Sequence, residues 1–285
     1  MIRSLNSGVS GIQNFQQQMD VIGNNIANVN TVAFKSGRTD FADSFSQTLR
    51  DSSAANGSNS GTPPIQVGLG VTTTATKNRF TQGTFSLTGV KTDLAVSGDG
   101  FFIVRDPVSG VEFATRAGDF RVDANGYLTT NTGLHVQGFN DGGLSTRGDV
   151  MLDDNRPAGA VATFAGFNIS DQGIVKIKLS DGSEYTRGQI LLQRFNDPQA
   201  LTKEGLNLYS GIGAAGPLGG ASAPTPGAPK TSGLGFIASG SLELSNVDLA
   251  VEFADMIITQ RGFQASARVI TTSDEMLQEL VNLKR

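Results

Sequence analysis

Apolar residues recur at every seventh position near the start of the chain, in two parallel rows. The rows consist of Leu5, Ile12, Met19 and Ile26, and, three residues after each of these, Gly8, Phe15, Ile22 and Val29. Apolar positions that alternate by three and four residues lie on one side of an α-helix and are typical of a helix that packs against other helices. The pattern predicts a helix over residues 3–29. We expect it to end in the asparagine-rich stretch that follows, since asparagine is a poor helix former.

The end of the chain repeats this pattern over a longer stretch. Six apolar residues follow one another at intervals of seven: Leu242, Leu249, Met256, Phe263, Ile270 and Leu277. A second row, four residues later, holds Phe253, Ala267 and Val281 and is interrupted by Gln260 and Asp274. We favour a nearly continuous helix over 242–283. The alternative is a break near 271–274, where Thr272 and Glu275 have the spacing of a capping box.

Between the two ends the period of the pattern changes to two. Within 174–179, apolar residues alternate with two lysines, which is typical of a strand with one buried face. Asp181-Gly182 then predicts a hairpin turn, with a return strand over 185–195. Further strands are predicted at 101–104, 111–115, 120–122, 127–129, 134–139 and 161–169. The middle of the chain is therefore predicted to be antiparallel β structure.

Two low-complexity segments flank the β region. Residues 51–64 and 214–235 are rich in Ser, Gly, Ala and Pro, and we expect them to be mobile or extended. The predicted fold class is mixed α and β, with long terminal helices that form a discontinuous, coiled-coil-like domain and a central antiparallel β domain. The predicted divisions are a helical assembly domain made of 1–35 and 241–285, an extended connector over 36–65, the β domain over 66–213 and a Gly/Pro/Ala-rich connector over 214–240.

Composition narrows the classes of function. The chain has 285 residues, of which 38% are hydrophobic, so it has enough apolar material for a substantial core. Its net charge is −4 and it contains no block of Lys and Arg, so neither nucleic acid nor an anionic membrane is an expected partner. The absence of Cys excludes disulfides and thiolate metal sites. We find no cleavable secretory signal, and no apolar run reaches the roughly 18 residues of a membrane span.

The few motifs that resemble chemical sites have better structural explanations. Gly211-Ile-Gly213-Ala-Ala-Gly216 has dinucleotide-fingerprint spacing, but Pro217 stands where a helix would have to begin. His135, the only histidine, lies in an alternating strand with no nucleophile or ligand set beside it. Asp123-x-Asn125-Gly126 lacks the other ligands of a calcium loop. We predict no cofactor, no metal and no catalytic site, and hence a protein that is not an enzyme.

The terminal rows allow two interpretations. In the first, the two helices simply pair within one chain. In the second, which we favour, neighbouring subunits of a polymer complete them. The reason is that five residues broaden the apolar surface beyond what one partner covers: Phe15, Val29, Ile257, Ile258 and Leu280. The helices would then become ordered on assembly. The predicted assembly interface comprises Leu5, Ile12, Phe15, Met19, Ile22, Asn25, Ile26, Val29, Leu242, Leu249, Phe253, Met256, Phe263, Ile270 and Leu277.

Three groups of segments resemble signatures of the bacterial flagellar rod and hook protein family. They are NNIANVNT at 24–31 with FK at 34–35, then FTQG at 80–83 with DLAV at 93–96 and GDGFF at 98–102, and finally SNVDL at 245–249 with QRGFQA at 260–265. Their order along nearly the whole chain matches that of the family. One departure is Ala33, which replaces the usual glycine and leaves open whether the backbone makes a left-handed turn there.

Within the family, ELSNVD at 243–248 and the segment from Asp274 to Leu280 look more like the hook than the rod, as do 41–43 and 66–71. The resemblance implies a structural subunit of the flagellar hook. Such a subunit polymerises through its terminal helices into a bendable tube that transmits motor torque to the filament. The distal rod protein of the basal body, whose size also fits, is the alternative.

The same resemblance implies a set of partners and a location. The partners are other copies in a helical homopolymer, the adjoining rod and hook–filament junction proteins, the hook cap during assembly and the flagellar type III export apparatus. The implied location is the extracellular hook, reached without a cleaved signal peptide, or the periplasmic rod in the alternative. A remoter hypothesis is a secreted β-rich binding module that its terminal coil assembles into a closed oligomer.

Overall fold

The computed structural model describes residues 2–54, 60–152, 164–217 and 225–283. The chain forms two units, each assembled from segments that are distant in sequence. Unit 1 consists of Met1–Ala27, Ser36–Arg79 and Val247–Arg285, and unit 2 of Asn28–Lys35 and Phe80–Asn246. The mixed α and β composition expected from the sequence is confirmed, with helices in unit 1 and a large antiparallel sheet in unit 2.

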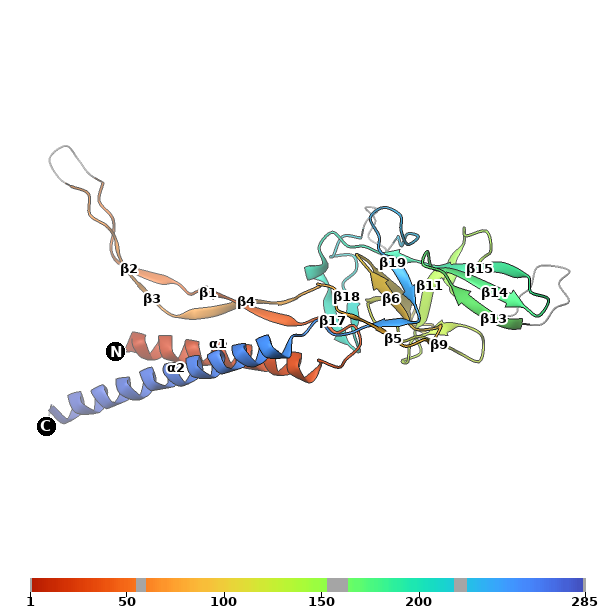
Figure 1. Ribbon diagram of the computed structural model, residues 1–285. Coiled ribbons are helices and arrows are strands. Elements are labelled where there is room, and N and C mark those ends of the chain that lie inside the picture. Colours follow the sequence, from red (N-terminus) through yellow and green to blue (C-terminus); the bar gives the residue numbers. More distant parts are fainter. Residues whose placement is uncertain (1, 55–59, 153–163, 218–224, 284–285) are drawn as a thin grey trace. The chain divides into compact units, whose positions relative to one another are not determined.

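Unit 1 contains two long helices, α1 (Ile2–Ala27) and α2 (Leu249–Leu283), which run antiparallel and side by side (Figure 1). The predicted start of the second helix near residue 242 is wrong. Asp248 caps α2, because its carboxylate accepts a hydrogen bond from the backbone N–H of Ala250 at 2.9 Å. Leu242 lies instead in strand β20 (Ser241–Glu243), which pairs with β5 (Phe85–Leu87) in unit 2.

Across 271–274 the helix is continuous, as favoured from the sequence, and the alternative break does not occur. The hydroxyl of Thr272 donates to the carbonyl of Arg268 at 2.9 Å, and that of Ser273 donates to Val269 O at 2.7 Å. Hydroxyls that bond back to the preceding turn are compatible with a helix interior, so the capping-box spacing is not used.

Neither α1 nor α2, as far as the structure describes them, combines the length and the hydropathy that a membrane crossing requires.

A two-stranded ribbon completes unit 1. Strand β1 (Gly37–Asp43) pairs with β4 (Val71–Asn78), and β2 (Ser46–Arg50) pairs with β3 (Ile65–Gly68). The predicted connector over 36–65 therefore contains strands, and β3 and β4 belong to unit 1 instead of the central β domain. The Val and Thr residues of β4 explain this, since β-branched side chains favour strands. In the low-complexity segment 51–64, Ser53 and Thr62 form a β-bridge, and 55–59 lie outside the described residues.

Unit 2 is built around an antiparallel sheet with the strand order β13-β14-β15-β11-β7-β8-β18-β17. Its strands are β7 (Phe101–Arg105), β8 (Glu112–Thr115), β9 (Arg121–Val122), β10 (Leu128–Thr129), β11 (His135–Phe139), β12 (Arg147–Asp149), β13 (Phe164–Ile169), β14 (Ile174–Leu179), β15 (Glu184–Ile190), β16 (Leu192–Gln193), β17 (Thr202–Gly205) and β18 (Leu208–Ser210). The predicted strand over 174–179 is confirmed as β14, with its lysines exposed and Val175, Ile177 and Leu179 buried. The other predicted strands are confirmed to within a few residues, and 161–163 lie outside the described residues.

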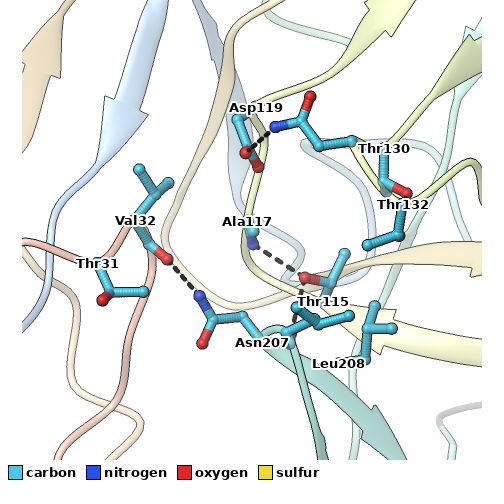
Figure 2. Close-up of a pocket in the computed structure, with 11 residues that line it drawn as sticks. Thr31, Val32, Thr115, Ala117, Asp119, Thr130, Thr132, Asn207 and Leu208 are labelled. Atoms are coloured by element: carbon cyan, nitrogen blue, oxygen red, sulfur yellow. Dashed lines mark hydrogen bonds between the residues drawn. The ribbon is translucent and has the colours of Figure 1, made fainter. Parts of the chain in front are cut away.

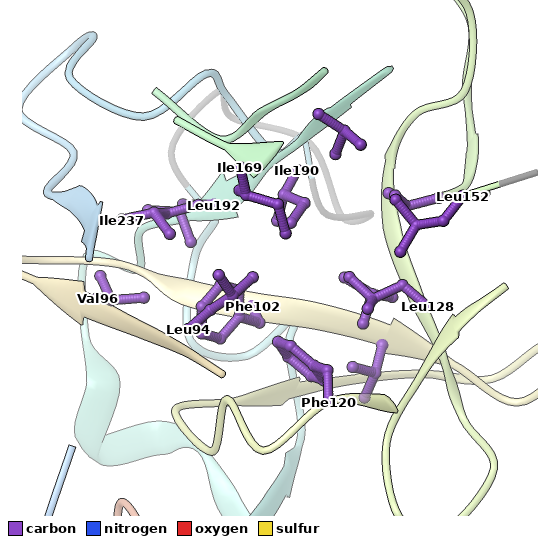
Figure 3. Close-up of a cluster of buried hydrophobic side chains, with 14 residues drawn as sticks. Leu94, Val96, Phe102, Phe120, Leu128, Leu152, Ile169, Ile190, Leu192 and Ile237 are labelled. Atoms are coloured by element: carbon purple, nitrogen blue, oxygen red, sulfur yellow. The ribbon is translucent and has the colours of Figure 1, made fainter. Parts of the chain in front are cut away.

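The main core of unit 2 lies on one side of this sheet. Figure 3 shows its side chains converging from β7, β15 and the segments next to them, with Phe102 and Phe120 among the largest. The rings of these two residues meet edge to face, with centroids 5.1 Å apart. A second cluster gathers around Phe101, Phe195 and Tyr209. These buried alternating positions explain why the two-residue period in the sequence located the strands.

The segment predicted as a connector over 214–240 is partly ordered into unit 2. Strand β19 (Phe236–Ser239) pairs with β6 (Leu94–Ser97), and Gly227 exchanges backbone hydrogen bonds with Leu192. Residues 218–224 lie outside the described residues. A single 3-10 turn, η1 (Pro198–Ala200), precedes β17.

The short N-terminal segment of unit 2, Asn28–Lys35, turns sharply at Ala33. The φ angle of Ala33 is 54°, so the left-handed turn forms although alanine replaces glycine. The residue is fully buried, and its N–H donates to Glu243 O at 2.8 Å. That contact joins an early part of the chain to a late one.

A buried group of charges strengthens this junction. Lys35 Nζ donates to Glu243 Oε1 at 2.6 Å and to Thr81 O at 2.8 Å, and both charged side chains are fully buried. Gly83 N donates to the same carboxylate oxygen at 2.9 Å, and Arg116 lies 3.6 Å from the other one. Burial lowers the pKa of Lys35, and the adjacent Glu243 carboxylate opposes that effect. The group connects four segments that are distant in sequence, inside unit 2.

We predict that Lys35→Met lowers the free energy of unfolding of unit 2 by about 3–5 kcal/mol, because it leaves a buried carboxylate short of its main partner. Scanning calorimetry of the full chain measures the change. Lys77→Met is the matched control, since Lys77 pairs with Asp40 at 2.9 Å on the surface, where loss of an ion pair changes stability little. Equal losses in the two variants would contradict the role assigned to Lys35.

Candidate functional site

The antiparallel pair of α1 and α2 is the candidate assembly site, and small residues bring the two backbones close together. Ser4 Oγ lies 3.4 Å from Ser273 Oγ at one end of the pair. A Cβ added at Gly8 would lie 3.0 Å from a side-chain carbon of Ile270. A Cβ added at Gly262 would lie 2.7 Å from the ring of Phe15. The ring of Phe15 therefore occupies the space that a side chain at position 262 would need.

The structure brings most of the predicted interface residues of α1 to its packed sides. Ile22 and Asn25 are buried, and Leu5, Ile12, Phe15, Met19 and Ile26 are half-buried. Val29 lies beyond the end of α1, in unit 2. On α2, Met256, Phe263, Ile270 and Leu277 are half-buried, whereas Leu249 and Phe253 are exposed. Leu242 is not on the helix at all, as described above.

The second row of α2 that packs on α1 is polar, and the apolar pattern of the sequence does not reveal it. It follows the first row by three residues instead of four and consists of Glu252, Thr259, Ser266 and Ser273. Thr259 is tolerated in this position because its hydroxyl donates to Asp255 O at 2.7 Å. The seven-residue spacing of these small and polar residues was visible in the sequence, but an apolar template does not detect it.

Asn25 connects three elements of unit 1. Its Nδ2 donates to the backbone carbonyl of Gly37 at 2.9 Å and lies 3.1 Å from both carboxylate oxygens of Glu252. Its Oδ1 accepts from Gly37 N at 2.9 Å. Asn25 thus holds the end of α1, the start of β1 and the first turn of α2 together. The hydrogen-bonding groups of its side chain are therefore already paired within one chain.

Glu252 is nearly fully buried in this arrangement. Burial raises its pKa, the hydrogen bond from Asn25 works in the opposite direction, and the nearby Asp255 carboxylate raises it further. The charged form of Glu252 is therefore less favourable in the folded unit than in the unfolded chain.

Hydrogen bonds attach the ribbon to α1. Asn14 Nδ2 donates to Val71 O at 2.8 Å, and the hydroxyl of Thr73 donates to Asn14 Oδ1 at 2.6 Å and to Gln17 Oε1 at 2.5 Å. These contacts cover the polar side of α1. As a result, α1 is packed against both β4 and α2.

By contrast, α2 has a second apolar surface that nothing in unit 1 covers. We call it the outer row, and it consists of Val251, Ile258, Val269, Met276 and Leu280, with exposed fractions of 43–67%. Separations of seven, eleven, seven and four residues keep these side chains on one side of the helix, about 100° around its axis from the side that packs on α1. The charged residues Arg261, Arg268, Glu275 and Glu279 lie outside this row. The outer row is therefore an apolar stripe along α2, with only the small residue Ala265 between Ile258 and Val269.

The residues considered for chemistry have structural roles in unit 2. His135 Nδ1 lies 2.9 Å from Asp149 Oδ2, and Arg105 donates to Asp149 Oδ1 at 2.9 Å. These donors lower the pKa of Asp149 against the opposing effect of burial. The ring of His135 also stacks on Tyr127. Throughout the part of the chain that the structure describes, no three His, Cys, Asp or Glu residues are grouped as metal ligands would be.

The contact between Phe15 and Gly262 leads to a prediction. We expect Gly262→Ala to destabilise the helix pair, because the new methyl group would overlap the Phe15 ring. Gly23→Ala in α1 is the matched control, since a Cβ there has no neighbour within 4 Å. It should stabilise the helix by up to about 1 kcal/mol. Thermal unfolding followed by circular dichroism at the helix band measures both, and stabilisation by both substitutions would contradict the close contact.

A second prediction concerns Glu252. A carboxyl group whose pKa is raised on folding contributes its full stability below the unfolded pKa and loses it as the pH rises through the folded pKa. Glu252→Gln should remove this loss and raise the melting temperature of unit 1 at neutral pH, while keeping an acceptor for Asn25. Glu275→Gln, on the exposed side of α2, makes the same charge change as a control. Identical pH profiles for wild type and Glu252→Gln would refute the prediction.

Three family models match the chain in order. The model described as "Flagella basal body rod protein" matches residues 5–35, "Flagellar hook protein FlgE/F/G D1 domain" matches 95–177, and "Flagellar basal body rod FlgEFG protein C-terminal" matches 238–283. The first and last matches cover α1 and α2, and the middle one lies within unit 2.

Similar proteins extend over the whole chain. The flagellar basal-body rod protein FlgG of Bacillus subtilis is 43% identical over 285 residues, which cover 100% of both chains. FlgG of Borreliella burgdorferi is 33% identical over 287 residues, again with 100% of both chains covered. The flagellar hook protein FlgE of Borreliella burgdorferi is 30% identical in an alignment of 449 residues that covers 100% of both chains. From these matches, the chain belongs to the flagellar rod and hook protein family, whose members are structural proteins of the flagellum.

Proposed function

We propose that this protein is a subunit of the distal rod of the bacterial flagellar basal body. Copies of it polymerise through the helices of unit 1 into a tubular segment of the flagellar axis, and they contact the neighbouring axial proteins at its two ends. One observation supports the proposal that the chain polymerises. It is the outer row of α2, an apolar stripe along most of the helix that is exposed to solvent in one chain.

The outer row is apolar surface that a single chain leaves unburied. Isolated exposed apolar residues are common on soluble proteins, but a continuous stripe along a long helix is typical of a surface that another molecule covers. In a helical polymer every subunit presents the same stripe to its neighbour, so each contact is repeated along the structure. Burial then contributes roughly 25 cal/mol per Å² of apolar surface. The stripe therefore supports association of many copies.

Chain length supports the rod over the hook. The rod protein of Bacillus subtilis aligns with this chain from end to end in 285 positions, the length of the chain itself. The alignment with the hook protein of Borreliella burgdorferi extends over 449 positions. A long stretch of that hook protein therefore has no counterpart in this chain. The segment resemblances at 243–248 and 274–280 favoured the hook, and the end-to-end comparison supports the rod better.

Two adjacent isoleucines provide a sharp test of the polymerisation. Ile258 belongs to the outer row and is 67% exposed, whereas Ile257 is 59% exposed and lies outside it. We expect Ile258→Asp to raise the protein concentration needed for polymer formation at least about tenfold, because a charge would be buried at every repeat of the contact. Ile257→Asp should have a smaller effect. Both variants should melt like the wild type as monomers, since neither side chain is buried.

Electron microscopy and sedimentation of concentrated protein measure the polymer. Wild-type polymer formation with no difference between the two variants would show that the outer row is not the contact. A separate measurement distinguishes rod from hook. An epitope-tagged chain that complements a strain lacking its rod protein should be found in purified basal bodies and should not be labelled by antibody on intact cells. Labelling outside the envelope would favour the hook.

A further inference from the structure

A cavity of about 270 Å³ opens in unit 2 beside the segment Asn28–Lys35. Its walls come from Thr31 and Val32, from the chain after β8, from the loop between β10 and β11, and from the turn that joins β17 to β18 (Figure 2). These walls belong to one unit, and the cavity is separate from the helices to which we assign polymerisation. Its lining is mostly threonine hydroxyl, amide and aliphatic groups.

Asp119 is the only charged residue among those that line the cavity. It accepts a hydrogen bond from Asn131 Nδ2 at 2.6 Å (Figure 2). Within the described residues it makes no ion pair, although its side chain is partly removed from solvent. Burial raises its pKa, hydrogen bonds oppose this, and the Asp93 carboxylate raises it further. A carboxylate that has no cationic partner in a partly desolvated cavity attracts a cation.

The other polar groups of the lining are already engaged with one another. Asn207 Nδ2 donates to Val32 O at 2.7 Å, and the Thr115 hydroxyl donates to Asn207 O at 2.9 Å. The hydroxyls of Thr130 and Thr132 lie 2.8 Å apart. The cavity is therefore held in its present shape, and its walls supply no cation that a small rearrangement would bring to Asp119.

Apolar side chains also line the cavity. Leu206 occupies the turn between β17 and β18 with φ of 51°, and its side chain is 76% exposed. Val32 and Leu208 line the cavity nearby. Lysine and arginine combine an aliphatic stem with a charged end, so a cavity lined by apolar side chains and one carboxylate matches both parts of such a side chain.

We propose that this cavity receives a lysine or arginine side chain from a second copy of the chain in the polymer. The aliphatic stem would contact Leu206, Val32 and Leu208, and the charged end would pair with Asp119. This inference rests on the proposed function, since it requires a polymer of identical subunits. It assigns to unit 2 an electrostatic contact that accompanies the apolar contact of α2.

The test is Asp119→Asn in the full-length chain. The variant keeps an oxygen that can accept from Asn131 but removes the charge. We expect the protein concentration that this variant needs for polymer formation to rise at least about tenfold, because a desolvated ion pair between subunits is lost. Its melting temperature as a monomer should stay equal or rise, because a partly buried charge is removed. Glu184→Gln, an exposed carboxylate on β15, is the matched control for net charge.

Each other outcome overturns the inference. If Asp119→Asn polymerises like wild type, with the same dependence on salt, the cavity is not an ionic contact, while the proposed function stands. If it lowers monomer stability and polymerisation together, Asp119 has only a structural role. If calcium chloride raises the melting temperature of wild type but not of Asp119→Asn, the cavity binds a free cation instead of a side chain. A wild-type chain that stays monomeric would refute the proposed function itself.

Discussion

The close approach of α1 and α2 determines how the apolar residues of unit 1 are used. Glycine at positions 8 and 262 and serine at 4, 266 and 273 let the backbones come together over little side-chain volume. A pair packed in this way buries only one side of α2 and places polar residues such as Glu252 and Thr259 inside the contact. Five large apolar side chains of α2, those of the outer row, are therefore left uncovered on its outer side. A pair built on leucine would bury more apolar surface internally and leave less for neighbouring molecules.

Two polar anchors join early and late parts of the chain, one within each unit. In unit 1, Asn25 binds Glu252 and Gly37, and in unit 2 Lys35 binds Glu243. Each anchor joins a residue from the early part of the chain to one from the late part. Buried polar contacts add little net stability, but they penalise alternative arrangements, because a shift in register would leave a charge or an amide unpaired. Apolar packing between helices has no such selectivity.

The sequence predicted the elements better than their limits. Alternation located β14 to the residue because one face of that strand is buried and the other carries lysines. The seven-residue row located α2, but it was extended to Leu242, since periodicity cannot distinguish the last strand of unit 2 from a first helical turn. Asp248, whose capping bond begins the helix, was the signal that marks the true start. The ribbon of β1 to β4 was missed because its strands are largely exposed and pair with each other, so they lack a clear apolar face.

The candidate site was predicted in part, and the missing part depended on tertiary structure. The rows on α1 and α2 were found, but which side of α2 faces α1 depends on where glycine permits close packing, and this is a property of the pair. Ala33 illustrates the same limit, because its left-handed φ is imposed by burial and by the bond to Glu243 against the preference of the residue. The pairing of Lys35 with Glu243 joins residues 208 apart in sequence, and no local pattern indicates it.

The Ser4–Ser273 contact spans 269 residues, nearly the full length of the chain. Contacts at such separation form late in folding, because the entropy of closing the loop must be overcome before they contribute. The first helix cannot stabilise itself in the meantime, since Gly8, Gly11 and Gly23 lower its intrinsic helicity. In any process that delivers the chain N-terminus first, α1 therefore lacks its helical partner α2 until the last residues arrive, and only the ribbon strand β4 can pack on it earlier. The order of the elements along the sequence thus delays the pairing of α1 with α2 until α2 has been delivered.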